Sequence, residues 1–236
     1  WNTQANGTGT SFENGAKVKN LATSGTITLY AQWTANKITL KYNGNGATST
    51  TPSDSSFYYG NTVKTADTPS RIYKITYVAN GGNVSPTSVD VSYKFGGWKS
   101  SANNGIYKAA TNYTDSFGAK SGSVTLTAQW TVTSVTLPTP TRTGYSFGGW
   151  YSDAACTKFV GKAGVTYIPT ATTTLYAKWT AKTYTVTFKA NSGKINLDNK
   201  GTFTDSQQYT DFKYDATTHN NVKNLYPQRT GYTFSG

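Results

Sequence analysis

Apolar and polar residues alternate in short stretches along this chain. In the stretch that ends at Trp33, the residues Ile27, Leu29 and Ala31 fall on the same side as the tryptophan, and the residues between them fall on the other side. The stretch from Val124 to Trp130 repeats this pattern. A period of two over this length is typical of a half-buried strand. We therefore predict strands that end with a tryptophan on their inner face.

A second kind of stretch comes before a tryptophan. From Tyr145 to Trp150, the residues Tyr145, Phe147 and Gly149 alternate with polar or small residues. Glycine inside a strand removes a side chain, which allows a bulge or a ring packed across the backbone. We predict a strand here that is interrupted at its glycines.

The six tryptophans divide into pairs, each with an opening and a closing member. The pairs are Trp1 with Trp33, Trp98 with Trp130 and Trp150 with Trp179, and their members are 32, 32 and 29 residues apart. Such self-similarity predicts an array of small units. The predicted structural core of the repeats consists of these six tryptophans and four aromatic residues of the opening stretches, namely Tyr145, Phe147, Tyr232 and Phe234.

The tryptophans admit two interpretations. They could fill small cores, because aromatic side chains dominate the apolar area of small units, or they could form an aromatic platform for sugars. We favour the core, and we predict that Trp33, Trp130 and Trp179 are mostly buried and interchangeable in role.

The composition predicts a mostly β protein, α+β at most, with little helix. Threonine, tyrosine and valine favour strands, whereas good helix formers are scarce and Glu13 is the sole glutamate. Aromatic residues make up 14 % of the 236 residues, which argues against disorder.

The motifs also resemble a known family. Strands that end in Asn-Gly or Asn-Gly-Gly, the run from Val135 to Tyr151 and the closing run from Thr174 to Thr180 are similar to the Listeria–Bacteroides repeat, the B-repeat family of internalin-type bacterial surface proteins. The resemblance implies tandem, compact, β-grasp-like units in an extracellular setting. It implies no catalytic residues.

The order of the repeat halves departs from that family. The opening half at 35–71 is followed by a new opening strand at 72–93 before its closing half arrives at 94–131, and 132–180 lacks an opening strand of its own. We predict two interlocked units, 35–71 with 94–131 and 72–93 with 132–180. The order reflects either strand exchange or a rearranged chain. Residues 1–34 are expected to be the closing half of a repeat, and residues 181–236 the opening half of another.

Candidate catalytic or metal-binding chemistry is weak throughout. The single Cys156 and the single His219 provide no metal-ligand cluster, and the ten acidic residues are scattered without spacing for calcium binding or glycoside hydrolysis. We interpret Cys156 as a half-buried filler and His219 as a solvated loop residue. We therefore predict a chain that is not an enzyme, with no catalytic residue, cofactor or metal site.

The net charge is +12, from 19 lysines and three arginines against ten acidic residues. Dispersed lysine is usually a solvated surface, and it also attracts polyanions such as acidic polysaccharide or host surface glycans. Nucleic acid is not expected as a partner, because arginines do not cluster. No apolar run reaches the roughly 18 residues of a membrane span.

The function expected from these patterns is that of a spacer and adhesion or assembly module in a bacterial surface adhesin. The alternative is a carbohydrate-binding module of a larger secreted enzyme, which exposed, coplanar tryptophans would favour. The opening at Trp1 without a start methionine suggests a fragment of a longer protein. The other expected partners are adjacent repeats or copies of the chain itself. The two terminal halves could complete each other within one chain or head to tail between chains, and we favour the second arrangement.

Overall fold

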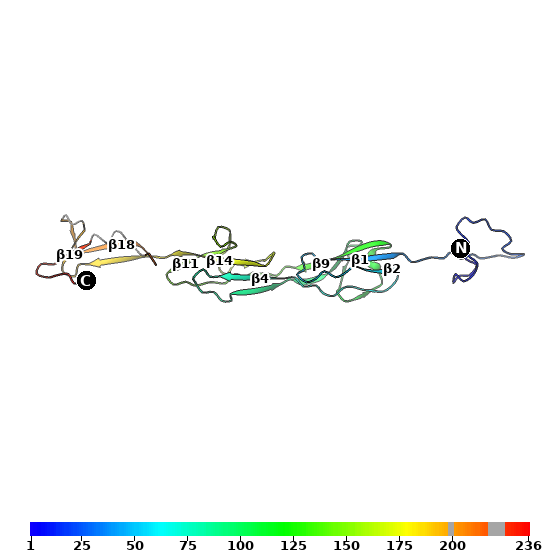
Figure 1. Ribbon diagram of the computed structural model, residues 1–236, viewed down its shortest axis with the longest axis horizontal. Helices are drawn as coiled ribbons and strands as arrows, with labels where there is room; N and C mark the ends of the chain where they lie inside the picture. Colours follow the sequence, from blue (N-terminus) through cyan, green and yellow to red (C-terminus); the bar gives the residue numbers. More distant parts are fainter. Residues whose placement is uncertain (198–200, 217–224) are drawn as a thin grey trace. The chain divides into compact units, whose positions relative to one another are not determined.

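The computed structural model describes residues 1–197, 201–216 and 225–236. The chain divides into two units, which are built mainly of β-strands (Figure 1). Unit 1 contains residues 1–71 and 94–131, and unit 2 contains residues 72–93 and 132–236. The chain therefore passes from one unit to the other three times.

Unit 1 contains a five-stranded mixed sheet in the order β2-β1-β9-β6-β7 and a separate pair, β3-β8. The bounds are β1 Lys37–Asn43, β2 Ser55–Tyr58, β3 Val63–Lys64, β6 Lys94–Ser100, β7 Ile106–Tyr107, β8 Asn112–Tyr113 and β9 Gly122–Thr131, with a 3-10 turn at Ser116–Gly118. The central strands β1 and β9 run parallel, and the flanking strands pair with them antiparallel.

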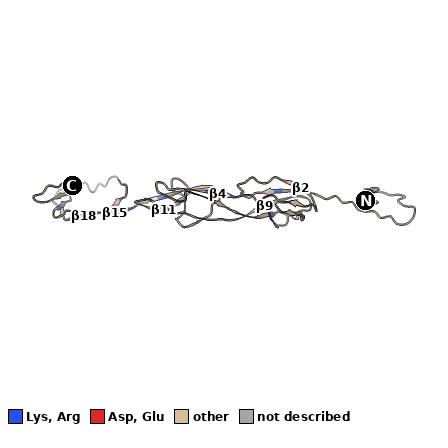
Figure 2. Ribbon diagram, turned by 90° about the horizontal axis from the view of Figure 1, so that it is seen from below, with Lys and Arg blue, Asp and Glu red and all other residues tan. Residues whose placement is uncertain are grey.

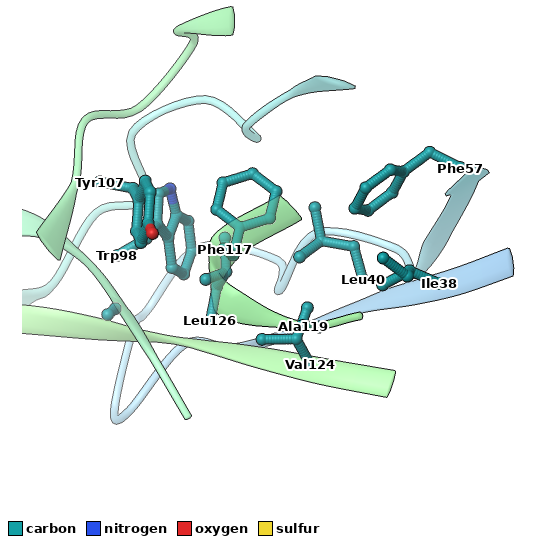
Figure 3. Packing of buried hydrophobic residues seen from close by; sticks show 10 residues of the cluster. Ile38, Leu40, Phe57, Trp98, Tyr107, Phe117, Ala119, Val124 and Leu126 are labelled. Atoms are coloured by element: carbon teal, nitrogen blue, oxygen red, sulfur yellow. The ribbon is translucent and has the colours of Figure 1, made fainter. Parts of the chain in front are cut away.

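The core of unit 1 lies on one face of this sheet. Leu40 of β1 is in register with Val124 of β9, and both are almost completely buried. The Phe117 ring belongs to the same cluster and lies 4.7 Å from the Tyr107 ring between centroids (Figure 3). Burying a side chain of this size contributes roughly 1.5–3 kcal/mol, so a few such residues stabilise a unit of this length.

Unit 2 contains a second five-stranded mixed sheet, in the order β12-β11-β14-β4-β5, together with the smaller sheets β10-β13, β15-β18 and β17-β16-β19. The bounds are β4 Ile72–Val78, β5 Ser88–Ser92, β10 Val135–Thr136, β11 Tyr145–Tyr151, β12 Phe159–Gly161, β13 Thr166–Tyr167, β14 Thr173–Ala181, β15 Thr183–Lys189, β16 Lys194–Asn196, β17 Phe203–Thr204, β18 Ser206–Lys213 and β19 Tyr226–Gln228. Here β4 and β14 form the parallel central pair.

The pairing follows the motif halves and not the order of the chain. The opening strand β1 pairs with the closing strand β9, although β4 and β5 lie between them in sequence. The later opening strand β4 pairs with β14. The prediction of a mostly β fold is confirmed, and the 3-10 turn at Ser116–Gly118 is the only helical element in the described ranges. The β-grasp-like description stays a prediction.

Two glycines explain how the opening tryptophans reach the core. In β11 the register with β14 shifts between Phe147 and Gly149, and Gly149 has φ +131°, a conformation that suits glycine. The extra residue is a bulge, which turns Trp150 onto the same face as Phe147. Gly97 has φ +122° at the corresponding bulge in β6. The predicted interruption of this strand at its glycines is therefore present.

One strand predicted from the alternation is wrong. Residues 26–33 do not form a strand, and within this stretch only Tyr30 makes a β-bridge, to Asn2. The physical reason is that a strand needs a hydrogen-bonded neighbour along its length, and no such neighbour lies beside this stretch in the described structure. His219 lies outside the described residues.

Candidate functional site

The most distinctive site in unit 2 joins the turn after β4 to the end of β14. The Asn80 side chain donates to the carbonyl of Ala177 at 2.8 Å, and the Trp179 indole N–H donates to the carbonyl of Ala79 at 2.7 Å. Asn80 has φ +47°, in the left-handed region that asparagine tolerates better than most residues. We call this reciprocal pair of hydrogen bonds the Asn–Trp clasp.

Unit 1 contains the same clasp at the equivalent positions. The Asn45 side chain donates to the carbonyl of Ala128 at 3.0 Å, and the Trp130 indole donates to the carbonyl of Gly44 at 3.1 Å. Asn45 also has φ +47°. The clasp therefore ties the closing strand to the opening turn in both units, in addition to the parallel pairing of the strands.

An arginine supports the clasp from outside. In unit 2, Arg142 donates to the carbonyl of Asn80 at 3.1 Å and lies over the Tyr145 ring at 3.7 Å. In unit 1, Arg71 donates to the carbonyl of Asn45 at 3.4 Å. An arginine over an aromatic face is stabilised by the ring quadrupole, so its charge is held at the turn.

The opening tryptophans are the deepest residues of the site. Trp98 and Trp150 are completely buried, and their indole N–H groups donate to the carbonyls of Ala66 at 3.3 Å and Pro138 at 2.9 Å. The Phe147 ring lies 5.5 Å from both the Trp150 and the Trp179 rings. Phe147 thus links the two tryptophans of unit 2 in one aromatic cluster.

The closing tryptophans differ from the prediction. Trp130 and Trp179 are half-buried, and Tyr145 and Phe147 are also half-buried. Trp33 is 91 % exposed, so the prediction that it is mostly buried is wrong. The reason is that its clasp partner, an opening turn with asparagine, is missing beside it in the described structure.

The remaining predicted core residues belong to the two terminal halves, and they are largely exposed. Trp1 is 50 % exposed, and Tyr232 and Phe234 are each 66 % exposed. The structure therefore brings together the aromatic residues of units 1 and 2 that lie between 35 and 180. The predicted core residues within 1–34, and those within 181–236, stay largely exposed.

The clasp asparagines Asn45 and Asn80 were not predicted as functional residues. The signal that identifies them is their recurrence at one position, the second residue after the opening strands β1 and β4. Cys156 is half-buried, as interpreted from the sequence.

Burial raises the pKa of several tyrosines, among them Tyr77 and Tyr42. The Tyr77 hydroxyl, for which the described residues provide no hydrogen-bond partner, has its pKa raised by burial and by the nearby Tyr167. The pKa of Tyr42 is also raised by burial, although its oxygen accepts a hydrogen bond from the Ala66 N–H at 2.9 Å. Both hydroxyls stay protonated at neutral pH and act as core groups.

The surface charge is basic and distributed. Every lysine in the described part of the chain is exposed, and Figure 2 shows lysine and arginine positions spread over many segments. One exposed ion pair joins Lys194 to Asp205 at 2.6 Å. With 22 basic and ten acidic residues, positive charges outnumber negative ones by twelve.

In the described part of the chain, no three side chains among His, Cys, Asp and Glu come together as metal ligands would. No helix in that part has the length and apolar character needed to span a membrane.

The five-stranded sheets of units 1 and 2 therefore belong to two similar β repeats, each closed by an Asn–Trp clasp. Residues 113–178 match the family model of the Listeria-Bacteroides repeat domain, which confirms the resemblance seen in the motifs for this segment. The matched segment begins in unit 1 and ends in unit 2, since the chain changes unit after Thr131.

One curated relative is a protein of Evansella cellulosilytica whose name describes it as a Gly-rich membrane protein. It is 29 % identical over 204 residues, which cover 82 % of this chain and 22 % of the relative. The chain thus spans about a fifth of the length of that protein. No solved structure matches this chain.

Proposed function

We propose that this chain is a non-enzymatic, extracellular repeat region of a bacterial cell-surface adhesin, in which the units act as spacer and adhesion or assembly modules. The observation that carries the proposal is the recurrence of the clasp in both units. The chemically distinctive residues of the motif, namely Asn, Trp and Arg, are engaged in closing the units. The matched repeat domain and the relative named as a membrane protein support a surface setting.

The surface setting is tested on intact bacteria that produce the protein. An antibody raised against this chain should label intact cells, and brief protease treatment of those cells should remove the label. Labelling that requires lysis would contradict the proposal. An antibody against a cytoplasmic protein of the same cells is the control for leakage.

The exposed lysines support a further part of the proposal, weak binding to acidic polysaccharide. Because the Debye length falls from about 10 Å at 0.1 M salt to about 3 Å at 1 M, such binding should be lost at high salt. The measurement is retention of the chain on immobilised polygalacturonate, with uncharged dextran as the control. Retention that is equal on both polymers, or unchanged by salt, would refute this part.

The alternative of a carbohydrate-binding module needs exposed, coplanar tryptophans. In the two clasped units Trp98 and Trp150 are completely buried, and the Trp130 and Trp179 indoles are bonded to the backbone. These four rings provide no open platform, so the structural role is the better supported one.

A further inference from the structure

The face of the unit 2 sheet that points away from its core carries a row of apolar side chains. The row crosses the neighbouring strands β12, β11, β14 and β4, whose direct pairs join Phe159 to Tyr151, Tyr151 to Tyr176, and Tyr176 to Val78. Successive residues of a strand point to opposite faces, and the residues on both sides of Tyr176 in β14 are buried in the core. We call these four side chains the outer row.

The outer row is accessible to solvent. Phe159 is 55 % exposed, and the other three residues of the row are half-buried. The Phe159 ring lies 5.4 Å from the Tyr151 ring between centroids, and a Cβ added to Gly149 would be 2.5 Å from it. The bulge glycine therefore lets the Phe159 ring lie against the backbone of the sheet, while more than half of its surface stays open.

Two exposed lysines flank the row. The Lys178 ammonium lies 5.0 Å from the centroid of the Tyr151 ring, and the Lys162 ammonium lies 5.8 Å from the centroid of the Phe159 ring. Each also donates one hydrogen bond to a backbone carbonyl, at 3.2 Å and 2.8 Å respectively. An ammonium group has three N–H donors, and neither lysine forms an ion pair with a described residue. Both charges are thus positioned beside the rings with donors left for an anion.

Unit 1 has no aromatic residue at the equivalent positions. The corresponding direct pairs of its sheet join Ile106 to Lys99, Lys99 to Thr127, and Thr127 to Asn43. Gln129 takes the position that Lys178 has in unit 2. The sheet of this repeat therefore forms without an aromatic outer row, so the row of unit 2 is not a requirement of the fold.

We propose that the outer row, together with Lys162 and Lys178, is a binding site for an acidic polysaccharide. This inference deepens the polysaccharide binding proposed above and rests on it. A sugar ring presents a face of C–H groups that packs on an aromatic ring, and the carboxylates of a uronic acid polymer pair with the two ammonium groups. Neighbouring strands lie about 4.8 Å apart, which is close to the length of one sugar residue, so consecutive sugars meet consecutive side chains of the row.

An acidic peptide fits the row less well. Three of its four strands, β11, β14 and β4, are paired on both edges, so this face offers side chains and not the free backbone groups that bind a peptide as an added strand. A flexible peptide held by side chains alone loses more conformational freedom on binding than a polymer of rigid sugar rings.

The aromatic part of the site is tested in the full chain with a fluorescently labelled oligogalacturonate, whose binding is followed by anisotropy. The row variant Phe159→Ile with Tyr176→Thr introduces the residues that unit 1 has at these positions and keeps the net charge. It should bind about three- to tenfold more weakly. The control Tyr58→Ile with Tyr59→Thr removes two exposed rings from unit 1 and should bind as the parent chain does. Equal binding by the row variant and the parent, or an equal loss in the control, would overturn the proposal.

The charged part of the site is tested with single substitutions that do not alter the core. Lys178→Gln introduces the residue of unit 1 and should weaken binding about two- to fivefold. Lys99→Gln removes the same charge from an exposed position of unit 1 and should change binding by less than about 1.5-fold. Equal losses in the two variants would show that the lysines attract the polymer without a defined site, and would overturn the assignment.

The class of ligand is tested by competition with the labelled probe. Unlabelled oligogalacturonate should displace the probe, whereas polyglutamate of equal charge and a neutral dextran oligosaccharide should each be at least about tenfold less effective. Displacement by polyglutamate at the same concentration as the sugar would identify an acidic peptide as the ligand and overturn the proposal.

Failure of the site is distinguishable from failure of the proposed function. If the parent chain binds the probe and the row variant and Lys178→Gln bind it equally well, the site is wrong and binding through distributed lysines stands. If the parent chain does not bind, both the site and the polysaccharide binding are wrong. The labelling of intact cells decides the surface setting in either case.

Discussion

Replacement of Trp150 by alanine should destabilise unit 2 far more than replacement of Trp33 affects the chain. Trp150 is completely buried, its ring lies 5.2 Å from the Tyr77 ring and 5.5 Å from the Phe147 ring, and its indole donates to Pro138 at 2.9 Å. Truncation of a core tryptophan costs about 3–5 kcal/mol, including the cavity that it leaves. The lost hydrogen bond, about 1 kcal/mol, places the expected cost in the upper half of that range.

The matched variant Trp33→Ala removes the same side chain from a position that is 91 % exposed. Its cost should stay within about 0.5 kcal/mol, the usual range for a surface substitution. The difference between the two variants, about 4 kcal/mol, is a large fraction of the stability of a small domain.

The assay is native-state hydrogen exchange followed by mass spectrometry, because it reports each unit separately where a single denaturation curve need not be two-state. In Trp150→Ala, the amides of β14 and β4 should lose about 4 kcal/mol of protection, while those of β1 and β9 keep theirs. A loss below about 1.5 kcal/mol, or an equal loss in Trp33→Ala, would refute the assignment of the core.

Three further predictions follow from particular residues. Asn80→Ala removes the clasp donor and places alanine at φ +47°, so it should cost about 1–3 kcal/mol by urea denaturation, and Asn80→Gly should recover part of this loss. Gly149→Ala should cost more than about 2 kcal/mol of stability, since the residue has φ +131° and a Cβ there would meet the Phe159 ring at 2.5 Å. A Cβ at Gly164 would meet open space, so the control Gly164→Ala should cost only about 1 kcal/mol. Equal costs for the two variants would contradict the bulge argument. The raised pKa of Tyr77 means that the unfolded chain releases the hydroxyl proton at a lower pH than the folded chain, so the free energy of unfolding should fall as the pH rises above about 10. Tyr77→Phe should weaken this dependence and leave the stability at pH 7 unchanged or slightly higher, because the Tyr77 hydroxyl has no hydrogen-bond partner in the described structure. An unaltered alkaline slope in the variant would refute this role of Tyr77.

The period-two alternation and the tryptophan pairs were enough to predict a mostly β chain of small repeats. They also indicated which halves could complete each other, because Trp130 and Trp179 each need an opening strand to cover. The recurrence of local motifs carries this information, since each half of a unit repeats its own pattern. The clasp was not predicted, because Asn80 and its carbonyl partner on Ala177 are 97 residues apart in the chain.

Burial was decided by the tertiary structure. The stretches that end at Trp33 and Trp179 have almost the same sequence pattern, yet Trp33 is exposed and Trp179 is half-buried against Phe147. Whether an apolar face is covered depends on a second strand and a turn, not on the segment that carries the face. The sequence therefore determined that each half-repeat has an apolar face that a second half must cover. The tertiary structure decided which faces are covered: in the described residues, those of the halves between 35 and 180 are covered, whereas those of the closing stretch in 1–34 and of the strand β15 are not fully covered.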